Sequence, residues 1–250
     1  MNHDPDSTRA RRGPLLRGFL VLTAVLSVVS IIAMVRSLAA MTYLNIHFRA
    51  EVDPYSRAVS YYVFYGDGRE EFATAVIVLA GGTLTTLLGL RVAGLRLGAR
   101  AGMFFGVWCT SLTLCAMFPT DNSKSITSVS GLIHQVAGAS LFVSLPLAGL
   151  ALAKRLVADL HWARVGLIVR RMAMVAMGLA AVYLATRLPD IFPGLAIPGI
   201  LDGRGVSGLV QRALFGLEML MLMALAVHLL RVTVGAARER REPARAEATG

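Results

Sequence analysis

The chain has 250 residues, of which 56% are apolar and 16% are charged, and its mean hydropathy is +0.64. Soluble domains have about 45–50% apolar and about 25% charged residues, so this composition argues against a soluble enzyme and against a disordered chain. Two cysteines exclude a disulfide-rich scaffold and a four-cysteine zinc site. The net charge of +10 does not indicate nucleic-acid binding, because the arginines lie between long apolar segments and form no polar face.

Six apolar segments follow one another along the chain. A helix needs about 20 residues to cross the hydrocarbon core of a bilayer. The predicted spans, in chain order, cover residues 15–35, 72–90, 101–118, 132–153, 172–188 and 208–230. The fifth span is short, although residues 165–169 would lengthen it. The sequence therefore predicts an all-α polytopic membrane protein with a bundle of six transmembrane helices over residues 15–231.

The basic residues predict the orientation of this bundle. Seventeen of the 25 lysines and arginines lie in the segments 1–17, 91–100, 154–171 and 231–250, and the other eight lie elsewhere. Cytoplasmic loops carry an excess of basic residues, so both termini are predicted to be cytoplasmic in a multi-pass protein of the cytoplasmic membrane. The polar residues 1–14 and the basic residues 232–250 are predicted to be disordered tails.

The longest predicted connection is the outer loop of residues 36–71. It contains five tyrosines, a residue type that favours the membrane–water interface. An interfacial lid and a ligand-contacting loop both fit this composition.

Several short motifs carry a resemblance to a known family. Residues 118–121 are Phe-Pro-Thr-Asp, residues 131–138 are Gly-Leu-Ile-His-Gln-Val-Ala-Gly, and residues 208–212 are Gly-Leu-Val-Gln-Arg. Together with Tyr55 and Ser56, this set resembles the bacterial six-span membrane family named domain of unknown function 998, over nearly the whole chain. The resemblance implies the six-helix fold and an outward-facing pair of Asp121 and His134, and it implies no reaction.

Asp121 and His134 are the first candidates for chemistry. They flank the loop between the third and fourth spans, so a carboxylate and an imidazole are expected near the outer membrane surface. Such a pair is able to act as a general base with its orienting group. The alternative is structural: Asp121 caps the loop or the helix, and the buried nitrogens of His134 are satisfied by hydrogen bonds. A Ser130–His134–Asp121 triad is disfavoured, because the loop is rich in serines and no oxyanion donor is evident.

Glu218 is the second candidate, since it lies near the bilayer midplane within the sixth span. A carboxyl group there is usually paired or protonated, and Gln211 projects from the same helix face. The two expectations are a proton site, or a protonated carboxyl bonded to a Ser or Thr of another helix. Arg212 at the outer end, with Tyr55 and Ser56 in the outer loop, is predicted to contact lipid or ligand.

No cofactor or metal is predicted. His134 and His228 lie toward opposite ends of their spans, so one haem cannot join them. The chain has no HxxH, HExxH or CxxC motif, and Cys109 and Cys115 lie on different faces of one helix. Small residues are predicted to form helix-packing seams, namely Gly102 with Gly106 in the third span and Gly81 with Gly82 in the second.

Three function classes remain open. The first is an accessory protein that binds membrane lipids or another membrane protein. The second is an enzyme acting on a lipid headgroup at the outer leaflet through Asp121 and His134. The third is a proton-coupled transporter using Glu218, which a single midplane carboxylate and the lack of a visible repeat make the weakest of the three.

Overall fold

The computed structural model describes residues 5–123, 126–191 and 205–239. Within these ranges, side chains are described for residues 18–123, 126–188 and 205–239. The described chain is all-helical. Its elements are α1 (Pro5–His47), the 3₁₀ helix η1 (Val59–Phe64), α2 (Gly68–Val92), α3 (Ala99–Met117), α4 (Val129–Leu156), α5 (Ala163–Ile191) and α6 (Ser207–Glu239).

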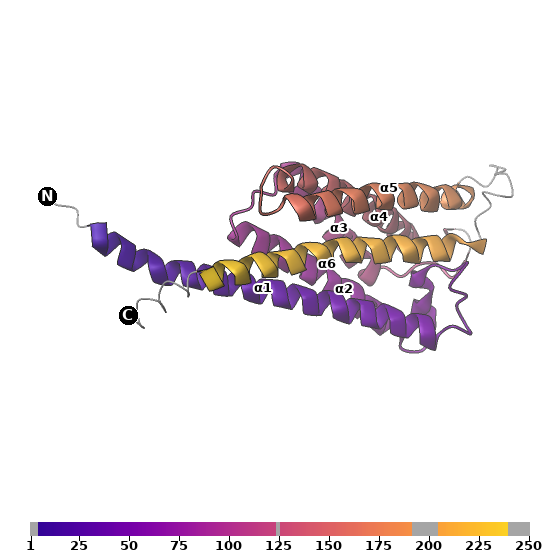
Figure 1. Cartoon of the computed structure of the whole chain (residues 1–250). Helices are drawn as coiled ribbons and strands as arrows, with labels where there is room; N and C mark the ends of the chain where they lie inside the picture. Colours follow the sequence, from indigo (N-terminus) through magenta and orange to yellow (C-terminus); the bar gives the residue numbers. More distant parts are fainter. Residues whose placement is uncertain (1–4, 124–125, 192–204, 240–250) are drawn as a thin grey trace.

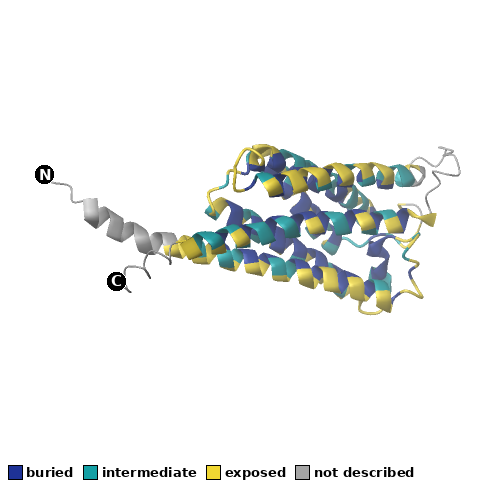
Figure 2. Ribbon diagram, in the orientation of Figure 1, coloured by how far each residue is buried: buried dark blue, intermediate teal, exposed yellow. Residues whose placement is uncertain are grey.

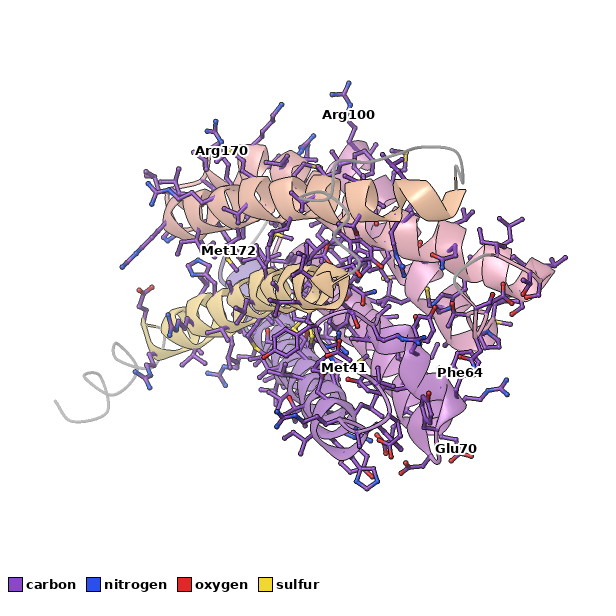
Figure 3. The ribbon with its side chains drawn as sticks, turned by 90° about the vertical axis from the view of Figure 1, so that its right-hand side faces the viewer. Met41, Phe64, Glu70, Arg100, Arg170 and Met172 are labelled. Atoms are coloured by element: carbon purple, nitrogen blue, oxygen red, sulfur yellow. The ribbon has the colours of Figure 1, made fainter. Side chains whose placement is uncertain are left out.

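The six α-helices form a closed ring in chain order. Each helix packs on the one before it, and α6 packs back onto α1 while also reaching α2 and α4. Figure 1 shows the start of α1 and the end of α6 at one end of the bundle, and η1 at the other. We call these the terminal end and the η1 end. Seen from the η1 end, the labelled Met41 lies toward the middle of the bundle, while Glu70, Arg100 and Arg170 lie at its edge (Figure 3).

The outer surface of the bundle is apolar. Buried residues face the middle of the bundle, and exposed residues cover its outside (Figure 2). Large apolar side chains are exposed there, including Val21 (64%), Ile32 (61%), Val136 (58%) and Leu220 (58%). Five described helices, α1, α2, α4, α5 and α6, are long and apolar enough to cross a membrane. An apolar exterior on such helices indicates a multi-pass membrane protein.

Three helices, α1, α5 and α6, extend well beyond the predicted spans. The helix α1 begins at Pro5, within the predicted tail, and continues to His47, so residues 36–47 of the predicted outer loop are helical. Arg36 does not end α1, because its guanidinium pairs sideways with Glu71 of α2 at 3.0 Å. The helix α5 begins at Ala163 and takes in residues 165–169. The helix α6 ends at Glu239, and the rest of the predicted C-terminal tail lies outside the described residues, as do residues 1–4.

Small residues bring α1 and α2 close together. The Ser30 hydroxyl donates to the Gly82 carbonyl oxygen at 2.7 Å, and the Ser37 hydroxyl donates to the Ala75 carbonyl oxygen at 2.8 Å. A Cβ on Gly82 would lie 2.8 Å from Ala33 Cβ, so Gly82 forms the predicted seam.

The other predicted small-residue seams do not form inside the chain. A Cβ on Gly81, Gly102 or Gly106 would meet nothing within 4 Å. The prediction was wrong for these three because glycine spacing shows where a close approach is possible, and not which face of the helix is turned inward.

The connection between α1 and α2 folds onto the start of α6. The Leu209 N–H donates to the Tyr55 carbonyl oxygen at 3.0 Å, and the Ser207 hydroxyl donates to the Ser56 carbonyl oxygen at 3.0 Å. Gly208 lies between them, where a Cβ would overlap backbone atoms of Pro54 and Arg57. The lack of a side chain at Gly208 therefore allows this close approach.

Gly208→Ala is expected to lower the free energy of unfolding by about 1–3 kcal/mol, because the added methyl group must push the connection off α6. Gly216→Ala on the same helix is the control, since a Cβ there would meet nothing within 4 Å and alanine favours a helix. Thermal unfolding in detergent measures both. Equal melting temperatures for the two variants would contradict the close packing at Gly208.

Candidate functional site

Arg212 is the centre of a hydrogen-bond network at the η1 end. Its Nε donates to Asn45 Oδ1 at 2.6 Å, and its Nη2 donates to the Tyr62 hydroxyl at 2.8 Å. Its Nη1 donates to three backbone carbonyl oxygens, those of Pro54, Arg57 and Gly208. The Tyr62 hydroxyl in turn donates to Asn45 Oδ1 at 2.8 Å. Arg212 thus joins α6, α1 and the connection that carries η1, and its donors are directed at protein acceptors.

Tyr55 and Ser56 belong to a turn held by Asp53. The Asp53 carboxylate accepts hydrogen bonds from the backbone N–H groups of Tyr55 and Ser56 and from the Ser56 hydroxyl. These bonds, with that of the hydroxyl foremost, lower the pKa of the Asp53 carboxyl. The Tyr55 ring remains 58% exposed at the surface. The turn therefore uses the Ser56 side chain internally and leaves the Tyr55 ring outward.

Asp121 lies against the first turn of α4. Its carboxylate accepts hydrogen bonds from the Ser128 hydroxyl at 2.7 Å and from the backbone N–H groups of Thr127 and Ser128. A Cβ on Gly131 would overlap this carboxylate, so glycine leaves room for it. The Ser128 hydroxyl bond and the Thr127 N–H bond lower the pKa of the Asp121 carboxyl. A carboxylate at a helix N-terminus is favourable, so these contacts give Asp121 a helix-capping role.

Asp121→Asn is expected to lower the melting temperature at neutral pH, because the amide is uncharged and offers only one accepting oxygen where the carboxylate uses two. The carboxylate has a lowered pKa in the folded state, so its stabilisation is present above the unfolded pKa of about 3.9 and is lost as the pH falls through the folded pKa. The difference between wild type and variant should therefore shrink at acid pH. A pH series of melting curves tests this, and a difference that is constant with pH would contradict it.

His134 is buried in α4 with one nitrogen fixed. Its side chain is 6% exposed, and its Nδ1 lies 2.7 Å from the Phe118 carbonyl oxygen. A carbonyl only accepts, so Nδ1 carries a hydrogen and a neutral ring has its lone pair on Nε2. The ring also contacts the Cys115 backbone, and His134 lines two cavities. His134 is therefore oriented by the end of α3 while it borders space that a ligand or water can enter.

Asp121 and His134 are not hydrogen-bonded to each other in the described chain. Within the described part of the chain, the carboxylate bonds to Thr127 and Ser128, and the imidazole bonds to Phe118. The Ser130 hydroxyl donates to the Pro119 carbonyl oxygen at 2.9 Å, so it is held away from the role of nucleophile. Asp121 and His134 nevertheless line one pocket together.

We call this pocket the η1-end pocket, and its volume is about 440 Å³. It is bordered by the connection to η1, the α3–α4 loop, α4, α5 and α6. Pockets of about 300–1,000 Å³ are typical of small-molecule sites. Its polar side chains include those of Ser60, Asp121, His134, Gln135, Arg187 and Gln211. The Gln211 Oε1 accepts the Val59 N–H at 2.9 Å, which holds η1 against α6.

The remainder of the η1-end pocket is apolar and reaches the outside of the bundle. Its wall includes Phe142 and Leu184, and its members Leu132 and Val136 are 49% and 58% exposed on the outer face of α4. Gly138 also lines the pocket, and a Cβ there would meet nothing within 4 Å. The pocket thus presents polar groups near the η1 end and hydrocarbon surface beside the apolar exterior.

A second, smaller cavity shares part of its lining with this pocket. This deep cavity has a volume of about 40 Å³ and shares Ser60, His134, Gly138, Phe142 and Gln211 with the η1-end pocket. Phe215 of α6 lines it as well. Glu218 lies three residues further along α6, fully buried, and neither carboxyl oxygen has a hydrogen-bond partner in the described chain. The expected bond from Glu218 to a serine or threonine is therefore not found there.

The histidines and cysteines are placed as the sequence predicts. His134 lies near the η1 end, whereas His228 Nε2 lies 2.9 Å from the His161 carbonyl oxygen in the α4–α5 connection, toward the terminal end. Cys109 and Cys115 are free and buried. Over the described residues no group of three or more His, Cys, Asp or Glu side chains is arranged to hold a metal ion.

Comparison with known families gives one match. The family described as "Protein of unknown function (DUF998)" matches residues 37–228. The chain belongs to the DUF998 family. No curated protein and no solved structure matches the chain. The DUF998 match includes the Arg212 network, both cavities and Glu218.

Sequence reasoning missed several residues of this DUF998 site. Asn45 was expected in a loop, and its helical position and contact with Arg212 became evident only from the structure. From the sequence, Tyr62 is only one of five outer-loop tyrosines expected at the membrane interface. Phe142 and Arg187 look like ordinary residues of a span, and Gly138 is only the last residue of a family motif. No local pattern distinguishes the residues that line a pocket.

Proposed function

We propose that this protein crosses the membrane six times, with α3 as the further span, and binds a membrane amphiphile in the η1-end pocket. The amphiphile has a polar headgroup among Ser60, His134, Gln135 and Gln211, and an apolar chain along α4 and α5. Binding of this kind suits an accessory protein of the bacterial cytoplasmic membrane. The observation that carries the proposal is a pocket that combines polar side chains with an exposed hydrocarbon wall.

The orientation that we propose places the η1 end outside. The basic segments 91–100 and 154–171 connect helices at the terminal end, and cytoplasmic loops are enriched in Lys and Arg. The helix α3 has 19 residues and carries one charged residue, Arg100, near its start. It packs between α2 and α4 in the ring, which supports a sixth crossing. Labelling of single introduced cysteines by a membrane-impermeant reagent in intact cells tests this arrangement.

Native mass spectrometry of the gently solubilised full chain tests amphiphile binding. The expected result is a discrete added mass that matches a membrane lipid and survives mild activation. A bare mass overturns the lipid proposal. A mass that includes a second polypeptide and no lipid also overturns it, and it would favour an accessory subunit that uses this face to bind a partner protein.

A second candidate function is hydrolysis or transfer of a lipid headgroup. The supporting observation is His134, whose Nδ1–H is held by the Phe118 carbonyl oxygen while the residue lines the pocket. An imidazole fixed at one nitrogen is able to take a proton from water or a hydroxyl at the other. Incubation of the purified protein with a total lipid extract tests this, with His134→Gln as the control. An extract in which every lipid is unchanged would exclude the reaction.

A further inference from the structure

Glu218 occupies a position where a carboxyl group is costly. It is the twelfth residue of α6, so it lies about 17 Å from the start of the helix at about 1.5 Å per residue. This is roughly half of the 30 Å hydrocarbon core. Its side chain is 0% exposed, and neither oxygen has a hydrogen-bond partner within the described chain.

The described core offers no cation to pair with this carboxyl. The buried titratable side chains other than Glu218 are His134, Cys109, Cys115, Tyr61, Tyr62 and Tyr183. No buried lysine or arginine occurs among the described side chains, and the one ion pair found there is Arg36–Glu71 near the surface. An ionised carboxylate without a partner is strongly disfavoured in such surroundings, whereas a neutral carboxylic acid is tolerated.

The deep cavity lies near this carboxyl and has room for water. A cavity needs about 10–15 Å³ of accessible volume to hold one water molecule, and the deep cavity has about 40 Å³. Ser60, His134 and Gln211 give such water polar partners. Phe215 also lines this cavity, and it shares its helix face with Glu218 at a spacing of three residues. Water in the cavity would thus lie about one helical turn from the carboxyl.

We propose that Glu218 is a proton-binding site that exchanges its proton with water of the η1-end pocket through the deep cavity. Uptake transfers one proton from that water to a carboxylate oxygen and gives a neutral carboxylic acid, and release is the reverse. The exchange requires Phe215 to move aside transiently. This site does not depend on amphiphile binding, so it is testable in the delipidated protein.

Infrared spectroscopy of the full chain in detergent tests the site. The expected spectrum at neutral pH has the carbonyl stretch of a carboxylic acid, which shifts on transfer to D₂O and is missing in Glu218→Gln. A spectrum without that band, or a band that persists in Glu218→Gln, would overturn the proposal. The glutamine variant keeps the side-chain shape and is neutral, so it matches the protonated state that the proposal assigns.

The route is tested by filling the cavity. Gly138 lines both cavities, so Gly138→Leu places a side chain beside both of them, and we expect exchange of the carboxylic-acid band in D₂O to slow at least tenfold. Gly106→Leu is the control, because Gly106 is also open to a Cβ but lines neither cavity. Equal exchange rates in the two variants would overturn the route through the deep cavity.

A measurement on the wild type alone covers the case in which Glu218→Gln does not fold. Dicyclohexylcarbodiimide is apolar, and the O–H of a carboxylic acid adds across one of its C=N bonds with no leaving group. Cleavage after Arg212 and Arg231 gives a peptide in which Glu218 is the sole carboxyl side chain. We expect the added mass on this peptide, and no labelling by a water-soluble carbodiimide. An unlabelled peptide would overturn the proposal.

Discussion

Replacing Arg212 with methionine is expected to lower the free energy of unfolding by about 3 kcal/mol. The guanidinium donates to Asn45, to the Tyr62 hydroxyl and to three backbone carbonyl oxygens. A hydrogen bond to a charged group contributes about 1.5–3 kcal/mol, and acceptors left unpaired add a further cost. For a chain of this size, the loss corresponds to a fall in melting temperature of about 6–12 °C.

The matched control is Arg36→Met on α1. Arg36 pairs with Glu71 at 3.0 Å, but the two side chains are 44% and 30% exposed, and such surface pairs contribute at most about 1 kcal/mol. Thermal unfolding of both variants in the same detergent compares the stability lost with the Arg212 network to that lost with the surface pair. Similar melting temperatures for the two would contradict the role assigned to Arg212.

The same comparison decides between two roles for Arg212. The sequence predicts that this arginine reaches lipid phosphate, whereas the structure directs its donors at acceptors within the protein. A lipid contact predicts normal stability and reduced lipid retention in Arg212→Met. A structural network predicts instead that Arg212→Met loses stability before it loses lipid.

The helices were predictable because a bilayer imposes a simple rule. Every backbone group must be satisfied inside the hydrocarbon core, so long apolar segments become helices whatever their exact sequence. Their ends were less predictable, as α1 shows. Arg36 resembles the end of a span, but the helix continues past it because Glu71 on the neighbouring helix offers a partner. A partner 35 residues away is not visible in a local pattern.

In the site, too, contacts between residues close in sequence were predictable, and contacts between distant residues were not. The capping role of Asp121 was one of two expectations, and its partners Thr127 and Ser128 lie within seven residues. The partner of Gln211 lies 152 residues away at Val59, and that of Arg212 lies 167 residues away at Asn45. Such contacts depend on which helices are neighbours, which hydropathy does not encode. Only Glu218 was conspicuous from its chemistry alone, because a carboxyl in a span is rare.

Replacing Gly138 with leucine is expected to abolish amphiphile binding without harming the fold. A Cβ at Gly138 meets nothing within 4 Å because the residue borders both cavities, so the leucine side chain occupies the space assigned to the ligand. Leucine is favoured over glycine inside a helix by nearly 1 kcal/mol, so the melting temperature should stay equal or rise. Loss of binding with unchanged stability is the signature of a filled pocket.

Native mass spectrometry of Gly138→Leu beside Gly106→Leu measures this effect. We expect the lipid-bearing fraction to fall at least tenfold in Gly138→Leu and to stay unchanged in Gly106→Leu, which adds the same side chain on the exposed face of α3. Equal lipid retention in the two variants would place the amphiphile elsewhere on the bundle. Because the Gly138 substitution leaves Arg212, Asp121 and Glu218 in place, a selective loss would assign binding to the space that Gly138 borders, of which the η1-end pocket is by far the larger part.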